Sequence, residues 1–114
     1  MPHIIVEYPE ESLNHDKIQQ MLQTIHRSAT DSGLFDENVI KTRAYPFNDF
    51  TNGGGDTPYI HIQVRILAGR SAENKKSLSE AISADLKPLG IRDSIITVEI
   101  VDMDRGSYEK LIPM

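Results

Sequence analysis

The sequence predicts an α+β fold in which two tandem β-α-β units form a four-stranded sheet with both helices on one face. Stretches rich in β-branched residues alternate with amphipathic stretches in the order β-α-β, loop, β-α-β. Each amphipathic stretch is long enough for a crossover, which predicts that the two strands it joins are parallel. The 114 residues suffice for one domain with its own core.

The first unit opens with a strand over residues 3–8, where β-branched residues dominate. Apolar residues then recur at helical spacing between 18 and 29, and Gly33 provides a stop signal for that helix. A second strand is expected over residues 39–45, ended by Pro46.

The second unit follows a turn-rich loop at residues 48–58. Residues 59–67 alternate regularly between apolar and polar side chains, which predicts a strand. Ser71 is the expected N-cap of a helix that ends by Gly90. Residues 95–103 form the last expected strand.

The two halves of the chain resemble each other. Residues 3–8 align with residues 61–66, so that the pseudo-repeats run over 2–50 and 58–108 within a single domain of residues 1–114. The sequence therefore indicates a weak internal duplication of a β-α-β unit.

Two helices on one face would leave the other face of the sheet uncovered. The apolar alternation expected on that face would have to be buried, which predicts a symmetric oligomer. The tail from Gly106 to Ile112 is expected to form a short strand or a hook onto another subunit.

Composition excludes several classes of function. A net charge of −5 argues against nucleic acid or an anionic membrane as the main partner, and no stretch is apolar for long enough to span a bilayer. The absence of cysteine excludes disulfides and thiolate chemistry, and a cytoplasmic location fits that composition. The four histidines lack the spacing of a zinc site, so no metal is expected.

Pro2, directly after Met1, is the first candidate catalytic residue. Removal of Met1 would leave a secondary amine at the start of a strand, and an amino terminus titrates near ~8, so it needs little adjustment to act as a base. With Met1 retained, the Pro2 nitrogen is an amide and cannot take a proton. The alternative is that Met-Pro is a common start without functional meaning.

Three basic residues are candidates for binding a carboxylate. Arg70 lies in the turn before the second helix, where free N–H groups and the helix dipole favour an anion. Lys41 and Arg43 are two residues apart on a strand and therefore share a face. A dicarboxylate held between Arg70 and this pair is one interpretation, and ordinary solvated surface charge is the other.

These residues together resemble the tautomerase superfamily, in which an amino-terminal proline is the catalytic base and a β-α-β unit is the building block. The resemblance rests on Pro2 opening a strand, on the duplicated unit and on Leu67-Ala68-Gly69-Arg70-Ser71 before a helix. Residues 62–108 look like the short 4-oxalocrotonate tautomerase chain. The double-length form is similar to the 5-carboxymethyl-2-hydroxymuconate isomerase family, with support from Met1-Pro2-His3-Ile4-Ile5-Val6-Glu7 and Ile40-Lys41-Thr42-Arg43.

The resemblance implies a cofactor-independent isomerase that converts a 2-hydroxymuconate-type dienol acid, in particular 5-carboxymethyl-2-hydroxymuconate, to its 2-oxo isomer. It implies Pro2 as general base, Arg70 and Arg43 as substrate-binding residues, and a homotrimer. Lys41 stands where the family usually has arginine, which keeps the charge and loses the planar fork. The expected apolar wall beside the proline consists of Phe47, Phe50 and Tyr108.

Two other functions remain open at this point. A decarboxylase, or a hydratase or dehalogenase, of the same superfamily would use the same scaffold on small unsaturated acids. A non-enzymatic oligomeric binding domain would have the same β-α-β composition and would tolerate the loss of Pro2.

Overall fold

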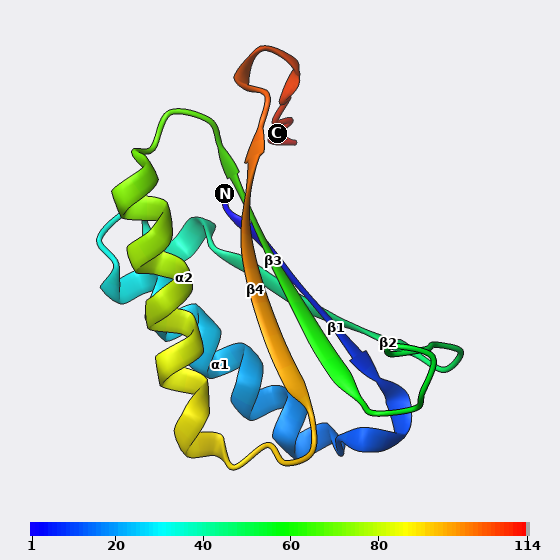
Figure 1. Cartoon of the computed structure of the whole chain (residues 1–114). Helices are drawn as coiled ribbons and strands as arrows, with labels where there is room; N and C mark the ends of the chain where they lie inside the picture. The colour runs from blue at the N-terminus through cyan, green and yellow to red at the C-terminus, as the bar shows by residue number, and fades with distance from the viewer. Residues whose placement is uncertain (114) are drawn as a thin grey trace.

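The four strands form one mixed sheet in the order β2-β1-β3-β4 (Figure 1). The computed structural model of the chain describes residues 1–113. The strands are β1 (His3–Pro9), β2 (Lys41–Phe47), β3 (Tyr59–Leu67) and β4 (Ile95–Met103). β1 is parallel to β2, β3 is parallel to β4, and the two pairs meet in an antiparallel arrangement of β1 and β3. The expected pairing of two β-α-β units is thus confirmed.

Both helices lie on one face of this sheet, as predicted (Figure 1). Helix α1 spans His15–Asp31 and is capped by Asn14, whose side chain accepts a hydrogen bond from the Lys17 amide at 2.8 Å. Helix α2 spans Ala72–Leu86, and Ser71 caps it by accepting from the Asn74 amide at 3.1 Å. No helix within residues 1–113 combines the length and the apolar character that crossing a membrane requires.

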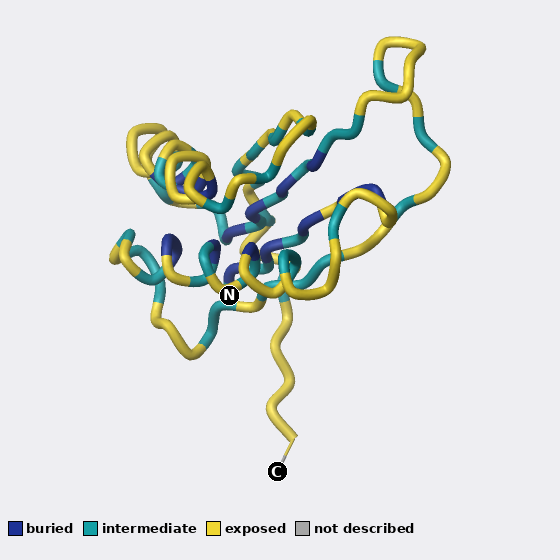
Figure 2. The backbone as a smooth tube through the Cα atoms, turned by 90° about the horizontal axis from the view of Figure 1, so that it is seen from below, coloured by how far each residue is buried: buried dark blue, intermediate teal, exposed yellow. Residues whose placement is uncertain are grey.

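The core lies between the helices and the sheet, where Figure 2 shows the buried positions gathered. On β3 every second side chain points to the helices and is fully buried, which follows from the two-residue period of a strand. The helices contribute one apolar stripe each. Their buried side chains are Met21, Ile25, Ala29, Leu78, Ile82 and Leu86. Removing this apolar surface from water is the main stabilising contribution.

The uncovered face of the sheet differs from the expectation of an apolar surface. On β1, β3 and β4 an apolar set of side chains faces the helices. The register therefore places Arg43, His61, Gln63 and Arg65 on the other face. This face therefore mixes charged, polar and apolar side chains, and its composition alone does not require burial.

The second strand begins later than predicted, because residues Glu37–Val39 form a short 3-10 turn and β2 starts at Lys41. Pro46 does not end the strand but lies within it, paired with Tyr8. A proline is tolerated there because β2 is at the edge of the sheet. After β4, the described part of the tail has a 3-10 turn at Arg105–Ser107 and no strand, so the expected short strand is absent from it.

Candidate functional site

The start of β1 lies at the end of the sheet that also carries two other candidate residues, Lys41 and Arg70. His3 pairs with Lys41 at the start of the parallel β2 and with Arg65 near the end of the antiparallel β3. The turn that carries Arg70 follows β3 directly. Figure 1 shows the N-terminus at this end, near the ends of β3 and β4. The topology therefore brings Pro2, Lys41 and Arg70 to one end of the sheet.

Pro2 is fully buried, and its carbonyl accepts a hydrogen bond from the Lys41 amide at 3.0 Å. The amino group of Met1, one residue before it, donates to the Val39 carbonyl at 2.6 Å. Burial and the nearby charges of Lys41 and Lys110 lower the pKa of the Met1 amino group below its ordinary 8.0. The surroundings of the chain terminus thus favour a neutral amine.

Arg70 connects two segments of the fold. Its Nη2 donates to the Leu34 carbonyl at 2.7 Å, and its guanidinium lies 5.7 Å from the centre of the Phe35 ring. Leu34 and Phe35 follow α1, so Arg70 ties the turn before α2 to the segment before β2. A guanidinium has five N–H donors, so other donors remain for an anion at this place.

Lys41 and Arg43 share a face of β2 but have different surroundings. Lys41 is exposed, and its Nζ donates to the Val39 carbonyl at 3.4 Å. Arg43 is half-buried, and its Nη1 donates to Nδ1 of His3 at 3.3 Å. Arg43 pairs with Ile5, which is one position out of step with the buried Pro2 and Ile4. Arg43 therefore faces the uncovered side of the sheet, whereas the Pro2 ring faces the helices.

His3 belongs to this site, although the sequence patterns did not predict it as a site residue. Its Nε2 is 2.9 Å from the hydroxyl of Tyr108, which belongs to the tail after β4. Burial lowers the pKa of His3 below its ordinary 6.5, and the charges of Arg43, Lys41, the amino terminus and Arg65 add to this effect. His3 pairs with the candidate residue Lys41 across β1 and β2, so a prediction of the strand register would have placed His3 at the site.

The expected apolar wall beside Pro2 is wrong for Phe47 and Phe50 of the same chain. Phe47 pairs with Pro9 at the far end of β1, so it lies about 20 Å from the start of β2. Phe47, Phe50 and Tyr59 pack as an aromatic cluster there, with ring centres 5.2 to 5.7 Å apart. Tyr108 does lie at the Pro2 end, beside His3.

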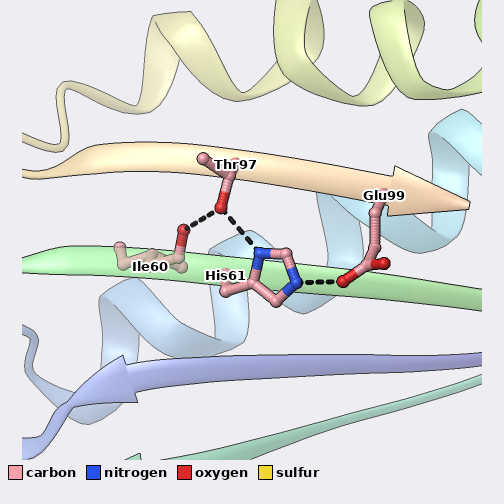
Figure 3. A network of polar contacts seen from close by, with 4 residues as sticks. All are labelled: Ile60, His61, Thr97 and Glu99. Atoms are coloured by element: carbon pink, nitrogen blue, oxygen red, sulfur yellow. Dashed lines mark hydrogen bonds and ion pairs between the residues drawn. The ribbon is translucent and has the colours of Figure 1, made fainter.

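His61 forms a separate polar contact on the uncovered face (Figure 3). Its Nδ1 is 2.7 Å from the hydroxyl of Thr97, and its Nε2 contacts the Glu99 carboxylate. His61 pairs with Glu7, four positions along β1 from His3, so this network lies apart from the residues at the Pro2 end.

Residues 2–102 match the profile of the family described as 5-carboxymethyl-2-hydroxymuconate isomerase. The chain belongs to this isomerase family. A sequence search of curated proteins found no match. Membership in the 5-carboxymethyl-2-hydroxymuconate isomerase family supports an isomerase or tautomerase function for the chain, in agreement with the resemblance seen in its motifs.

Solved structures with the same fold include relatives of three kinds. A 5-carboxymethyl-2-hydroxymuconate isomerase from Deinococcus radiodurans R1 is similar over 96% of this chain and 88% of that chain, with 24% identity and a TM-score of 0.82. A wild-type fused 4-OT that forms an asymmetric trimer covers 95% and 91%, with 16% identity and a TM-score of 0.80. A malonate semialdehyde decarboxylase inhibited by 3-bromopropiolate covers 97% and 91%, with 16% identity and a TM-score of 0.77. These similarities show a tautomerase fold.

Proposed function

We propose that this member of the isomerase family is a keto–enol tautomerase in which Pro2, freed by removal of Met1, is the general base. The observation that carries the proposal is the environment of the chain terminus. The Met1 amino group is partly buried beside Lys41 and has a lowered pKa, and the Pro2 position, one residue further in, is fully buried. A base that is neutral near neutral pH is what proton abstraction requires.

The reaction moves one proton and shifts two double bonds. The neutral Pro2 nitrogen takes the proton from the 2-hydroxyl group of a dienol acid, and the oxygen lone pair forms the 2-oxo carbonyl. The double bonds shift along the chain, and the distal carbon receives the proton back from the Pro2 nitrogen. Atoms and charge balance without a redox step, so the proposal requires no cofactor.

The substrate class is a di- or tricarboxylate dienol of the 2-hydroxymuconate type, and 5-carboxymethyl-2-hydroxymuconate is the substrate that the family name points to. Arg70, Lys41 and Arg43 are the proposed carboxylate-binding residues. Cationic groups at this end of the sheet would also stabilise the dienolate that develops when the enol proton leaves.

We propose a homotrimer as the functional assembly. Fused 4-OT chains of the same fold form trimers, and the face of the sheet opposite the helices is available for contacts between copies. The residues on that face are polar as well as apolar, so we expect hydrogen bonds and ion pairs to contribute to the contacts between subunits.

A spectrophotometric assay tests the proposed function. Protein whose mass shows that Met1 is absent is mixed with 5-carboxymethyl-2-hydroxymuconate or with 2-hydroxymuconate, and the loss of dienol absorbance is followed. We expect rapid loss with at least one substrate, and a decrease in kcat of about 100-fold or more in Pro2→Ala. A native rate in protein that retains Met1 would contradict the proposed base, and no acceleration over buffer with either substrate would contradict the tautomerase function.

A further inference from the structure

Three side chains from distant parts of the sequence form a connected polar chain beside the N-terminus. His3 of β1 contacts Arg43 of β2 through Nδ1 at 3.3 Å and Tyr108 of the tail through Nε2 at 2.9 Å. The imidazole and phenol rings also pack edge to face, with centres 6.0 Å apart. All three side chains are half-buried, so they are held in place and still reach solvent.

The partners of His3 define where its proton lies. A guanidinium can only donate, so the Nδ1 atom that faces Arg43 has to accept and carries no hydrogen. In the neutral ring the hydrogen is therefore on Nε2, which donates to the oxygen of Tyr108. The Tyr108 hydroxyl hydrogen is then free to donate to another group.

This cluster carries the charge of Arg43, and no carboxylate of residues 1–113 is paired with it. None of the ion pairs within residues 1–113 involves His3 or Arg43. Lys41, Arg65 and the amino terminus add positive charge around His3. Lys110, two residues after Tyr108, contributes to the lowered pKa of the Met1 amino group, which places this part of the tail near the chain terminus. A half-buried pair of donors in positive surroundings favours a carboxylate ligand.

We propose that neutral His3 is a positioning residue that holds Arg43 and Tyr108 as a pair of donors for one carboxylate of the substrate. This rests on the proposed function, because the carboxylate belongs to the dienol acid on which Pro2 acts. His3 itself touches Arg43 and Tyr108 and not the substrate. The Tyr108 hydroxyl thereby becomes a binding group and not only part of an apolar wall.

Protonation of His3 disrupts the arrangement. A hydrogen on Nδ1 would face the Arg43 guanidinium, so the two groups would repel and separate. The charged or titratable groups around the ring are Arg43 and Lys41 on β2, Arg65 on β3, Tyr108 on the tail and the amino terminus. Arg43, Lys41 and Arg65 are cationic, as is the amino terminus when it is protonated, and each of these charges opposes protonation of His3. Because the pKa of His3 is lowered below its ordinary 6.5, we expect KM for the dicarboxylate to rise only as the pH falls through that lowered pKa, while kcat changes less.

Three variants and one control test the contacts of His3 with Arg43 and with Tyr108. Tyr108→Phe keeps the ring and removes the hydroxyl. His3→Asn keeps an acceptor near the Nδ1 position for Arg43, and His3→Gln keeps a donor near the Nε2 position for Tyr108. His15→Asn, at an exposed histidine on α1, is the matched control.

We expect KM to rise about tenfold in Tyr108→Phe, His3→Asn and His3→Gln, with kcat changed by less than about threefold and no change in His15→Asn. Tyr108→Phe should raise KM less in the His3→Asn background than in the wild type, because the hydroxyl is no longer oriented there. Unchanged KM in Tyr108→Phe and His3→Asn would overturn the proposal.

A binding measurement separates this proposal from the proposed function. Nitrogen-15 spectra of the His3 ring report its tautomer, and titration with adipate, a dicarboxylate that cannot tautomerise, reports binding without turnover. We expect an Nε2–H ring, a shift of its signals on binding, and a Kd about tenfold weaker in Tyr108→Phe. An Nδ1–H ring, or equal Kd values, would overturn the role of His3 even in an active enzyme. If the wild type fails to turn over either dienol and these binding effects persist, only the tautomerase function is wrong.

Discussion

The carbonyl of Pro2 accepts the amide hydrogen of Lys41 at 3.0 Å, immediately before the first residue pair of β1 and β2. Pro2 is therefore fixed by the sheet on one side and by burial of its ring on the other. A proline base at this position would have little freedom to move away from its substrate. Preorganisation of this kind reduces the entropy lost when the reacting atoms are aligned.

The pH profile of the processed protein tests whether the chain terminus is the base. Only the neutral amine can take a proton, so kcat/KM should be high above the pKa of the amine and fall as the pH decreases through it. Burial and nearby cations lower the pKa of the Met1 amino group, and we expect the same surroundings to lower that of a Pro2 amine, so the midpoint should lie below the ordinary 8.0 of an amino terminus.

Lys110 offers a matched variant for this profile. Its charge helps to lower the amino-group pKa, so Lys110→Ala should move the midpoint upward, and added salt should do the same in the wild type. Lys76→Ala, at an exposed position of α2, is the control and should leave the midpoint unchanged. A midpoint that stays the same in Lys110→Ala and in high salt would argue against the amine as the titrating group.

The strands could be predicted from the sequence where the side-chain pattern is strict. β3 and β4 have the predicted bounds, because their alternation or β-branched run is uninterrupted. β2 was less predictable, because the 3-10 turn before it and the proline inside it depend on its place at the sheet edge. Edge position is a property of the assembled sheet and not of a local pattern.

The candidate site was predictable only in part for the same reason. Pro2, Lys41 and Arg70 could be selected by residue type and position, and the topology then places them at one end of the sheet. The contact between His3 and Tyr108 joins residues 105 positions apart, and it depends on how the tail folds back after β4. Phe47 and Phe50 were placed wrongly because the parallel register sends the end of β2 to the far end of β1.

Arg70 has a structural contact and a proposed binding role, and one variant tests both. Arg70→Ala removes the hydrogen bond to the Leu34 carbonyl and the contact with Phe35, so the free energy of unfolding should fall by about 1 kcal/mol. If Arg70 binds a substrate carboxylate, KM should also rise about 10- to 100-fold.

Arg92→Ala is the matched control, because Arg92 is exposed in the loop before β4. It should change neither urea unfolding nor KM. A lower stability of Arg70→Ala with an unchanged KM would show that Arg70 only ties the turn before α2 to the segment after α1.

The contact between Ser28 and Asp85 joins the two helices through a carboxylate of α2. Ser28 of α1 is 2% exposed, and its hydroxyl donates to the Asp85 carboxylate of α2. Asp85→Ala would leave a buried hydroxyl without its partner, which should lower the free energy of unfolding by about 1–3 kcal/mol in urea. Asp85→Asn retains an acceptor and should recover much of that loss.

Glu80→Ala, at an exposed position of the same helix, is the control and should change the free energy of unfolding by less than about 0.5 kcal/mol. Equal unfolding midpoints for Asp85→Ala and Glu80→Ala would mean that this contact contributes nothing to the packing of the two helices.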